Sequence, residues 1–188
     1  MNIIISKGGE CELKRLKFDI VESINDILKY VPYEDMLEIS HILVTDSPSH
    51  KSRHNHKVLG SYFRKNNQRA YIELYLKNLF GHIKSSESFE QMFDIQTLGL
   101  AQTIYHEIGH HLREIRTHGI KKGKRESFAE SYARRIQGAY VLDKAQAINS
   151  CFKHLKSIAE SEGLSLEIIN NMESGWQRIY EEALKETK

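Results

Sequence analysis

The stretch Thr103–Ile115, TIYHEIGHHLREI, decides the fold expected for the middle of the chain. Apolar residues recur there at alternating steps of three and four, the spacing of one buried stripe on a helix. That stripe comprises Leu98, Ala101, Tyr105, Ile108, Leu112 and Ile115. At about 100° per residue, His106 and His110 lie one turn apart on a different face, with Glu107 beside them. The histidines are therefore not part of the predicted core stripe.

Two imidazoles on successive turns of a helix can bind the same zinc ion, and a catalytic zinc normally has three protein ligands. His118, on an expected loop, is one alternative for the third ligand. A second helix offers a carboxylate from the segment 125–136, RESFAESYARRI, whose shared face comprises Glu126, Ala129, Glu130 and Ala133. Because these two alanines would let the second helix approach the histidine helix closely, we predict that Glu126 is the third ligand. Glu130, one turn on, is predicted to accept the second ring N–H of a ligand histidine.

The pattern HEIGH followed by ESFAESYA resembles the gluzincin clan of zinc metallopeptidases. It is closest to the small gluzincins of peptidase family M48 and of the ImmA/IrrE group. The resemblance implies a zincin-like fold, with His106, His110 and Glu126 as zinc ligands and Glu107 as the general base. Glu130 departs from the family pattern, which has aspartate or asparagine there. The metzincin pattern does not fit, because Arg113 and Arg116 occupy its glycine and histidine places.

The expected chemistry is peptide-bond hydrolysis with one zinc ion. Such an ion lowers the pKa of bound water and polarises a carbonyl, and Glu107 can take the water proton and pass it to the leaving amine. A developing oxyanion needs a further donor. We predict Tyr140 for this role, with Tyr132 and His118 as alternatives.

The rest of the chain predicts an α+β fold. Residues 13–30 have the apolar spacing of an N-terminal helix, and residues 38–48 are typical of a strand. Residues 58–76 predict a hairpin with its turn at 65–68, which makes a small three-stranded, mainly antiparallel sheet. From about Glu90 the pattern is helical, with breaks near residues 119–123 and Gly163.

We expect one domain over residues 1–188, because 188 residues with 40% hydrophobic content suffice for one sizeable core. Within it, residues 1–95 supply helix and sheet, 96–142 the metal-site helices, and 143–188 the C-terminal helices. No apolar run is long enough for a membrane span, and no secretory leader is evident at the start. Cys11 and Cys151 lack the spacing of a zinc site or disulfide framework. These features predict a cytoplasmic protein.

By the same resemblance, a peptide or protein substrate is expected to bind along an edge strand, taken to be Tyr71–Leu76. Basic residues in the hairpin turn at 65–68 and in the loop at 121–125 would favour acidic peptides if they border that groove. Two alternatives stay open. One is a regulatory protein with a latent or single-partner metallopeptidase-like site, and the other a nucleic-acid-binding protein whose basic loops bind and whose zinc is structural. The histidines of the 49–57 loop are interpreted as solvated polar residues.

Overall fold

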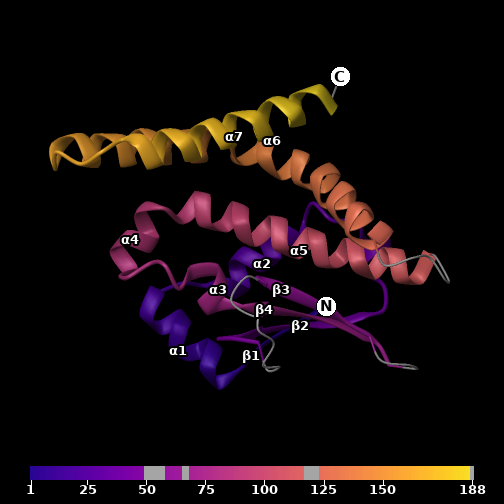
Figure 1. Ribbon diagram of the computed structural model, residues 1–188. Coiled ribbons are helices and arrows are strands. Elements are labelled where there is room, and N and C mark those ends of the chain that lie inside the picture. The colour runs from indigo at the N-terminus through magenta and orange to yellow at the C-terminus, as the bar shows by residue number, and fades with distance from the viewer. Residues whose placement is uncertain (49–57, 65–67, 117–122, 187–188) are drawn as a thin grey trace.

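A four-stranded mixed sheet forms one side of the molecule. The computed structural model describes residues 1–48, 58–64, 68–116 and 123–186 (Figure 1). The strands β1 (Asn2–Ile5), β2 (Ile39–Thr45), β3 (Gly60–Phe63) and β4 (Ala70–Tyr75) lie in the order β1-β2-β4-β3. β1 and β4 each pair with β2 in parallel, and β3 pairs with β4 antiparallel. The α+β class and the hairpin are confirmed; residues 65–67 of the predicted turn at 65–68 lie outside the described residues.

The predicted three-stranded, mainly antiparallel sheet is wrong in strand number and direction. The missing strand is β1, whose isoleucines pair with β2 from Asn2 opposite His41 to Ile5 opposite Val44. Four residues are too short to show a period of two, and their partner lies far along the chain. Parallel pairing therefore depends on a crossover, which the local pattern of residues 2–5 does not encode.

The predicted helix over 13–30 is two helices, α1 (Lys7–Leu16) and α2 (Ile20–Leu28). Lys17 has a left-handed backbone with φ of 53° and ends α1. Asp19 then caps α2 by accepting a hydrogen bond from the Glu22 N–H at 3.0 Å. This break turns α2 against the sheet, so that Ile20, Ile24 and Ile27 are buried.

The strand expected at the sheet edge, Tyr71–Leu76, is mostly interior. Residues 71–75 belong to β4, which lies between β2 and β3, while Leu76 begins the short helix α3 (Leu76–Phe80). The edge on this side is β3, which lies against the central helix α5 (Phe93–Arg116). A Cβ on Gly60 of β3 would stand 2.9 Å from Thr103 Cγ2 of α5. A glycine therefore permits the edge strand to approach the helix that carries the histidines.

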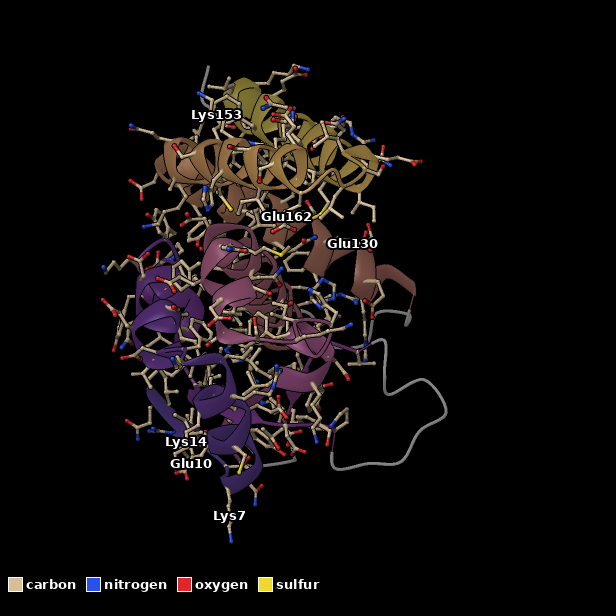
Figure 2. All side chains as sticks on the ribbon, turned by 90° about the vertical axis from the view of Figure 1, so that its left-hand side faces the viewer. Lys7, Glu10, Lys14, Glu130, Lys153 and Glu162 are labelled. Carbon is tan, nitrogen blue, oxygen red and sulfur yellow. The ribbon has the colours of Figure 1, made fainter. Side chains whose placement is uncertain are left out.

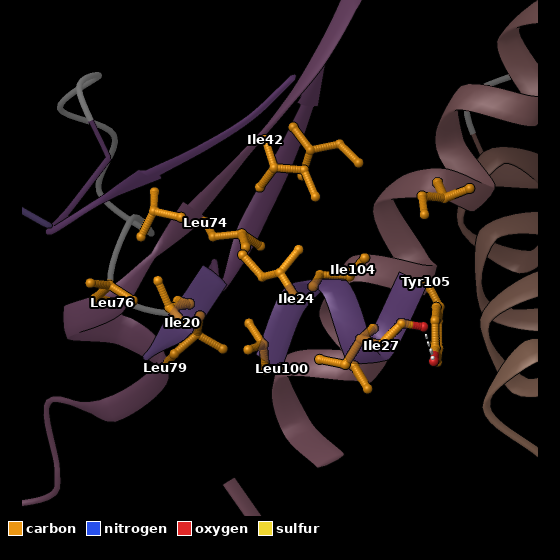
Figure 3. Close-up of a cluster of buried hydrophobic side chains, with 14 of the residues drawn as sticks. Ile20, Ile24, Ile27, Ile42, Leu74, Leu76, Leu79, Leu100, Ile104 and Tyr105 are labelled. Atoms are coloured by element: carbon orange, nitrogen blue, oxygen red, sulfur yellow. Dashed lines mark hydrogen bonds between the residues drawn. The ribbon is translucent and has the colours of Figure 1, made fainter. Parts of the chain in front are cut away.

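Two layers of helices lie on one face of the sheet (Figure 1). α2 and α5 cover the sheet, and α6 (Gly123–Ser161) and α7 (Glu167–Glu186) lie beyond α5. The 3-10 turn η1 (Tyr33–Met36) and the short helix α4 (Ser86–Gln91) complete the described elements. Figure 3 shows the core between sheet and helices, where Ile24, Ile42, Leu74 and Ile104 are fully buried. Burial of each such side chain contributes about 1.5–3 kcal/mol.

A second, smaller core joins α6 to α7. It includes Val141, Ile148, Phe152 and Trp176, and Leu98 of α5 packs against both cores. The predicted break near Gly163 is confirmed, since Gly163 adopts a φ of +65° between the two helices. None of the helices in the described ranges is both long and apolar enough to cross a membrane.

Candidate metal centre and adjoining pockets

The central helix α5 holds His106, Glu107 and His110 on a face that points away from the core. The stripe predicted for this helix is confirmed: four of its members are buried, and Leu98 and Ile115 pack against the core from its margin. Core packing therefore fixes the rotation of α5 about its axis. Both histidine side chains keep partial exposure, 27% for His106 and 19% for His110.

A close crossing of α5 and α6 brings Glu126 to the histidines. Gly109 of α5 faces Ala129 of α6, and a Cβ at Gly109 would stand 2.7 Å from the Ala129 Cα. Ala129 and Ala133 are buried at this crossing, as their small size predicts. Glu126 is about one turn before Ala129 on the same helix, so the crossing sets its position over His106 and His110.

Three ligand atoms converge at this crossing. The Nε2 atoms of His106 and His110 are 3.0 Å apart, and Glu126 Oε2 lies 3.5 Å from the first and 3.6 Å from the second. Around zinc with bonds of about 2.0–2.1 Å, atoms at tetrahedral angles stand about 3.3–3.4 Å apart. The three side chains therefore fit one zinc ion. Within the described ranges, they are also the only group of three histidine, cysteine, aspartate or glutamate residues whose ligand atoms all lie within 4.8 Å of one another.

The electrostatics of the pair suit a metal ligand. Burial and the neighbouring His106 lower the pKa of His110 below its ordinary value of 6.5. His110 is therefore neutral at pH 7, the form in which imidazole binds metals. The Glu126 side chain is 65% exposed, so its carboxylate reaches the histidines from the solvent side.

Glu107 is buried beside the ligands, with 7% of its surface exposed. Burial raises the pKa of Glu107 to about 8, and the Glu126 carboxylate adds to the rise. The Tyr62 backbone N–H lowers the pKa of Glu107, because it donates a hydrogen bond to the carboxylate. This bond links Glu107 directly to the edge strand β3.

His111 plays a structural part that was not predicted. It is fully buried, with Nε2 2.7 Å from the Leu37 carbonyl oxygen and Nδ1 3.2 Å from the Tyr62 hydroxyl. It therefore fixes β3 and the segment before β2 to α5. The signal was available, because the steps from Ile104 through Ile108 and His111 to Ile115 place this histidine on the core face.

The tyrosines expected to stabilise an oxyanion lie elsewhere. Tyr140 is buried against Tyr30 and Tyr105, with ring centroids 5.3 and 6.4 Å away. Tyr140 lies on nearly the same face of α6 as Glu126. It is fourteen residues further along the helix, however, which places it about 21 Å away along the helix axis. The structure therefore does not bring Tyr140 to the histidines.

The alternative tyrosine is also engaged elsewhere. The Tyr132 hydroxyl donates a hydrogen bond to Asp35 Oδ2 at 3.0 Å, and Asp35 Oδ1 accepts one from Arg116 at 3.0 Å. This cluster joins η1 to α5 and α6. The third candidate, His118, lies outside the described residues.

Two pockets flank the metal centre. One, of about 850 Å³, runs between α5 and α6 toward the end of α7 and includes His106, Glu107 and Glu126. The other, of about 610 Å³, opens along β3 and includes Tyr62, Arg64 and Arg125. Of the basic residues expected to border the groove, those at 65, 121, 122 and 124 have side chains outside the described part of the chain, whereas Arg125 lines the pocket along β3.

Glu130 lines the larger pocket and is exposed on α6 (Figure 2). Among the described contacts, it has no hydrogen bond to either histidine. Its predicted orienting role therefore stays a prediction.

Compared with protein-family models, curated proteins and solved structures, the chain matches none of them.

Proposed function

We propose that the protein is a zinc-dependent peptidase whose metal ligands are His106, His110 and Glu126. The observation that carries the proposal is the convergence of their three ligand atoms, 3.0–3.6 Å apart, beside the buried carboxyl of Glu107. A purely structural zinc site has no need of a buried carboxyl group next to the ligands. When bound, zinc would lower the pKa of water and polarise a substrate carbonyl.

Glu107 is the proposed general base. It accepts the proton of the attacking water and returns it to the leaving amine, so no covalent bond forms between substrate and protein. The Tyr62 N–H holds its carboxylate at one place while the proton moves. Partial burial of both histidines limits water at the reacting centre, which strengthens these electrostatic interactions.

The edge strand β3 is the proposed site for the substrate backbone. The Leu59 carbonyl accepts the Tyr75 N–H, so alternate residues of β3 point their backbone groups toward β4. Gly60 and Tyr62 therefore point theirs outward, beside Glu107. The Tyr62 N–H is engaged with Glu107, so an extended peptide can add to this edge through the Gly60 backbone groups and the Tyr62 carbonyl oxygen. Such backbone hydrogen bonds make modest demands on the sequence of the peptide.

Zinc analysis with a cleavage assay tests this proposal. Wild type, His106→Ala, Glu126→Ala, Glu107→Gln and the control His154→Ala, an exposed histidine far along α6, are purified and their zinc is measured. Each is then incubated with a labelled unfolded protein. We expect one zinc per chain in wild type, Glu107→Gln and His154→Ala, and loss of zinc in the two ligand variants.

Cleavage is expected in wild type and His154→Ala alone. A wild type without zinc, or full zinc retention in Glu126→Ala, contradicts the ligand set. A zinc-loaded wild type that cleaves nothing favours the regulatory alternative instead.

A further inference from the structure

The larger pocket extends well beyond the groups that the proposed chemistry uses. Along α6, the residues Glu126, Glu130, Ala133 and Gln137 line it at steps of three and four, over about 16 Å of helix. Its far end is formed by α7, where Ala183 packs near Gly138 of α6. The metal centre therefore lies at one end of a trench that leads toward the C-terminal helix.

The rim of this trench is negative. Beyond the metal ligands it carries Glu130, Glu182 and Glu186 against one arginine, Arg134. Glu182 and Glu186 are exposed on successive turns of α7. No ion pair within the described ranges involves any of the three glutamates.

The walls of the trench suit a long, unbranched side chain. Gly99, Thr103, Ala133 and Ala183 leave space between the helices, and Ile179 adds an apolar surface. A lysine or arginine packs its methylene stem on such a surface while its charged end stays near a polar rim.

Gln137 provides an independent sign of a ligand. Its side chain is 6% exposed, it lines the trench, and its buried Nε2 finds no hydrogen-bond partner among the described residues. A buried polar atom without a partner is costly, and most such atoms in native proteins are paired. A side-chain amide carries both a donor and an acceptor and can rotate to present either. Gln137 can therefore form a hydrogen bond with a side chain that enters the trench.

We infer that this trench binds a lysine or arginine side chain of the substrate, a few residues away from the bond that is cut. The inference rests on the proposed peptidase function and adds a charge preference to it. The pocket along β3 has the opposite character, since besides Glu107 and the metal ligands its described lining holds Arg64, Arg113 and Arg125 against Glu114. The two sides of the cleavage site therefore differ in the charge that they accept.

Peptide binding to zinc-loaded, full-length Glu107→Gln tests the inference without cleavage. The probes are fluorescent decapeptides of one neutral background, in which lysine, norleucine or glutamate replaces each position in turn, and anisotropy gives Kd. At one position we expect lysine to bind about five-fold tighter than norleucine, because two exposed ion pairs are formed. Adding Glu182→Lys with Glu186→Lys should abolish or reverse this preference. Adding Glu181→Lys, exposed but outside the trench, should preserve it.

Gln137→Met supplies a second measurement. It should weaken binding of the lysine peptide and leave the norleucine peptide unaffected. Equal binding of lysine and norleucine at every position, an unchanged preference in the double variant, or no peptide binding overturns the inference. The proposed peptidase function can fail independently of this inference. If zinc-loaded wild type cleaves no substrate but the Glu107→Gln variant still prefers lysine, the trench remains a binding site and the peptidase proposal is refuted.

Discussion

Gly109 of α5 and Ala129 of α6 are in direct backbone contact, and a Cβ on Gly109 would stand 2.7 Å from the Ala129 Cα and 3.0 Å from its carbonyl oxygen. Both neighbours are backbone atoms that cannot rotate away. The contact holds the two helices at the distance at which Glu126 reaches His106 and His110. The glycine inside HEIGH is therefore a packing requirement of the candidate metal centre.

Gly109→Ala is expected to push α6 away from α5. We predict destabilisation by about 1–3 kcal/mol, the usual cost of overpacking, and weaker zinc binding because Glu126 moves with α6. Thermal unfolding and zinc titration measure the two effects. Gly99→Ala in the same helix is the control, since a Cβ there meets nothing within 4 Å and should stabilise by about 0.5–1 kcal/mol. Wild-type stability and zinc affinity in Gly109→Ala would refute the prediction.

Tyr132→Phe removes a hydroxyl that bonds to the buried Asp35. We predict a loss of about 2 kcal/mol, since the acceptor is a carboxylate, and a fall in Tm of about 4–8 °C. The cleavage rate below the new Tm should stay at its wild-type value, because this hydroxyl is engaged with Asp35. A fall in kcat at unchanged Tm would instead assign Tyr132 to the reaction.

Gln137→Met replaces a buried amide, whose Nε2 has no partner in the part of the chain that the structure describes, by an apolar side chain of similar length. In the absence of peptide this should stabilise the protein by about 1 kcal/mol, or about 3 °C in Tm. Gln102→Met serves as the control, because Gln102 is exposed on α5 and its replacement should change stability by less than about 0.5 kcal/mol. Marked destabilisation by Gln137→Met would mean that the amide already has a partner.

Asp26 of α2 pairs with Lys144 of α6 at 2.9 Å and with Lys29 at 2.9 Å. Hydrogen bonds from Lys144 and then Lys29 lower the pKa of Asp26 below 3.8. Because the folded pKa is below the unfolded one, this stabilisation is present at neutral pH and is lost as pH falls below 3.8. Asp26→Asn should therefore cost about 1 kcal/mol at pH 7 and almost nothing near pH 2. Urea unfolding at both pH values checks this; a difference of equal size at both would contradict it.

Cys11 and Cys151 are expected to differ sharply in reactivity. Cys11 is exposed, whereas Cys151 is buried and donates a hydrogen bond to the Gln91 carbonyl oxygen. Burial raises the pKa of the Cys151 thiol to about 11, so about one thiol in a thousand is ionised at pH 8. A disulfide reagent should label one cysteine per native chain and two after unfolding. Native labelling should vanish in Cys11→Ser, and labelling that persists there would show that Cys151 is accessible.

Patterns within a single helix were sufficient for part of the site. The steps of three and four in α5 predicted its buried stripe, and the same periodicity separated His106 and His110 from that stripe. Small residues in α6 predicted the close crossing at Ala129 and Ala133. These features depend on residues within a few helical turns, and helix geometry fixes their relative angles.

The predictions that failed depend on distance along an axis or on partners far away in sequence. Tyr140 returns to the Glu126 face by angle, yet the rise of α6 carries it four turns away to Tyr30 and Tyr105. The prediction that Tyr71–Leu76 is an edge strand is wrong because β2 pairs with the side of β4 that does not face β3. That pairing joins segments some thirty residues apart in the sequence.

The sequence alone determined the α+β class, the helical face shared by His106, Glu107 and His110, and the helical face of Glu126, since these follow from local periodicity. Only the tertiary structure decided that β1 completes a mixed sheet and that β3 is the edge beside Glu107. It also decided that α7 brings Glu182 and Glu186 to the trench beside the metal centre. The physical reason is the same in each case: strand pairing and helix docking are chosen by burial summed over the whole chain, which no short segment encodes.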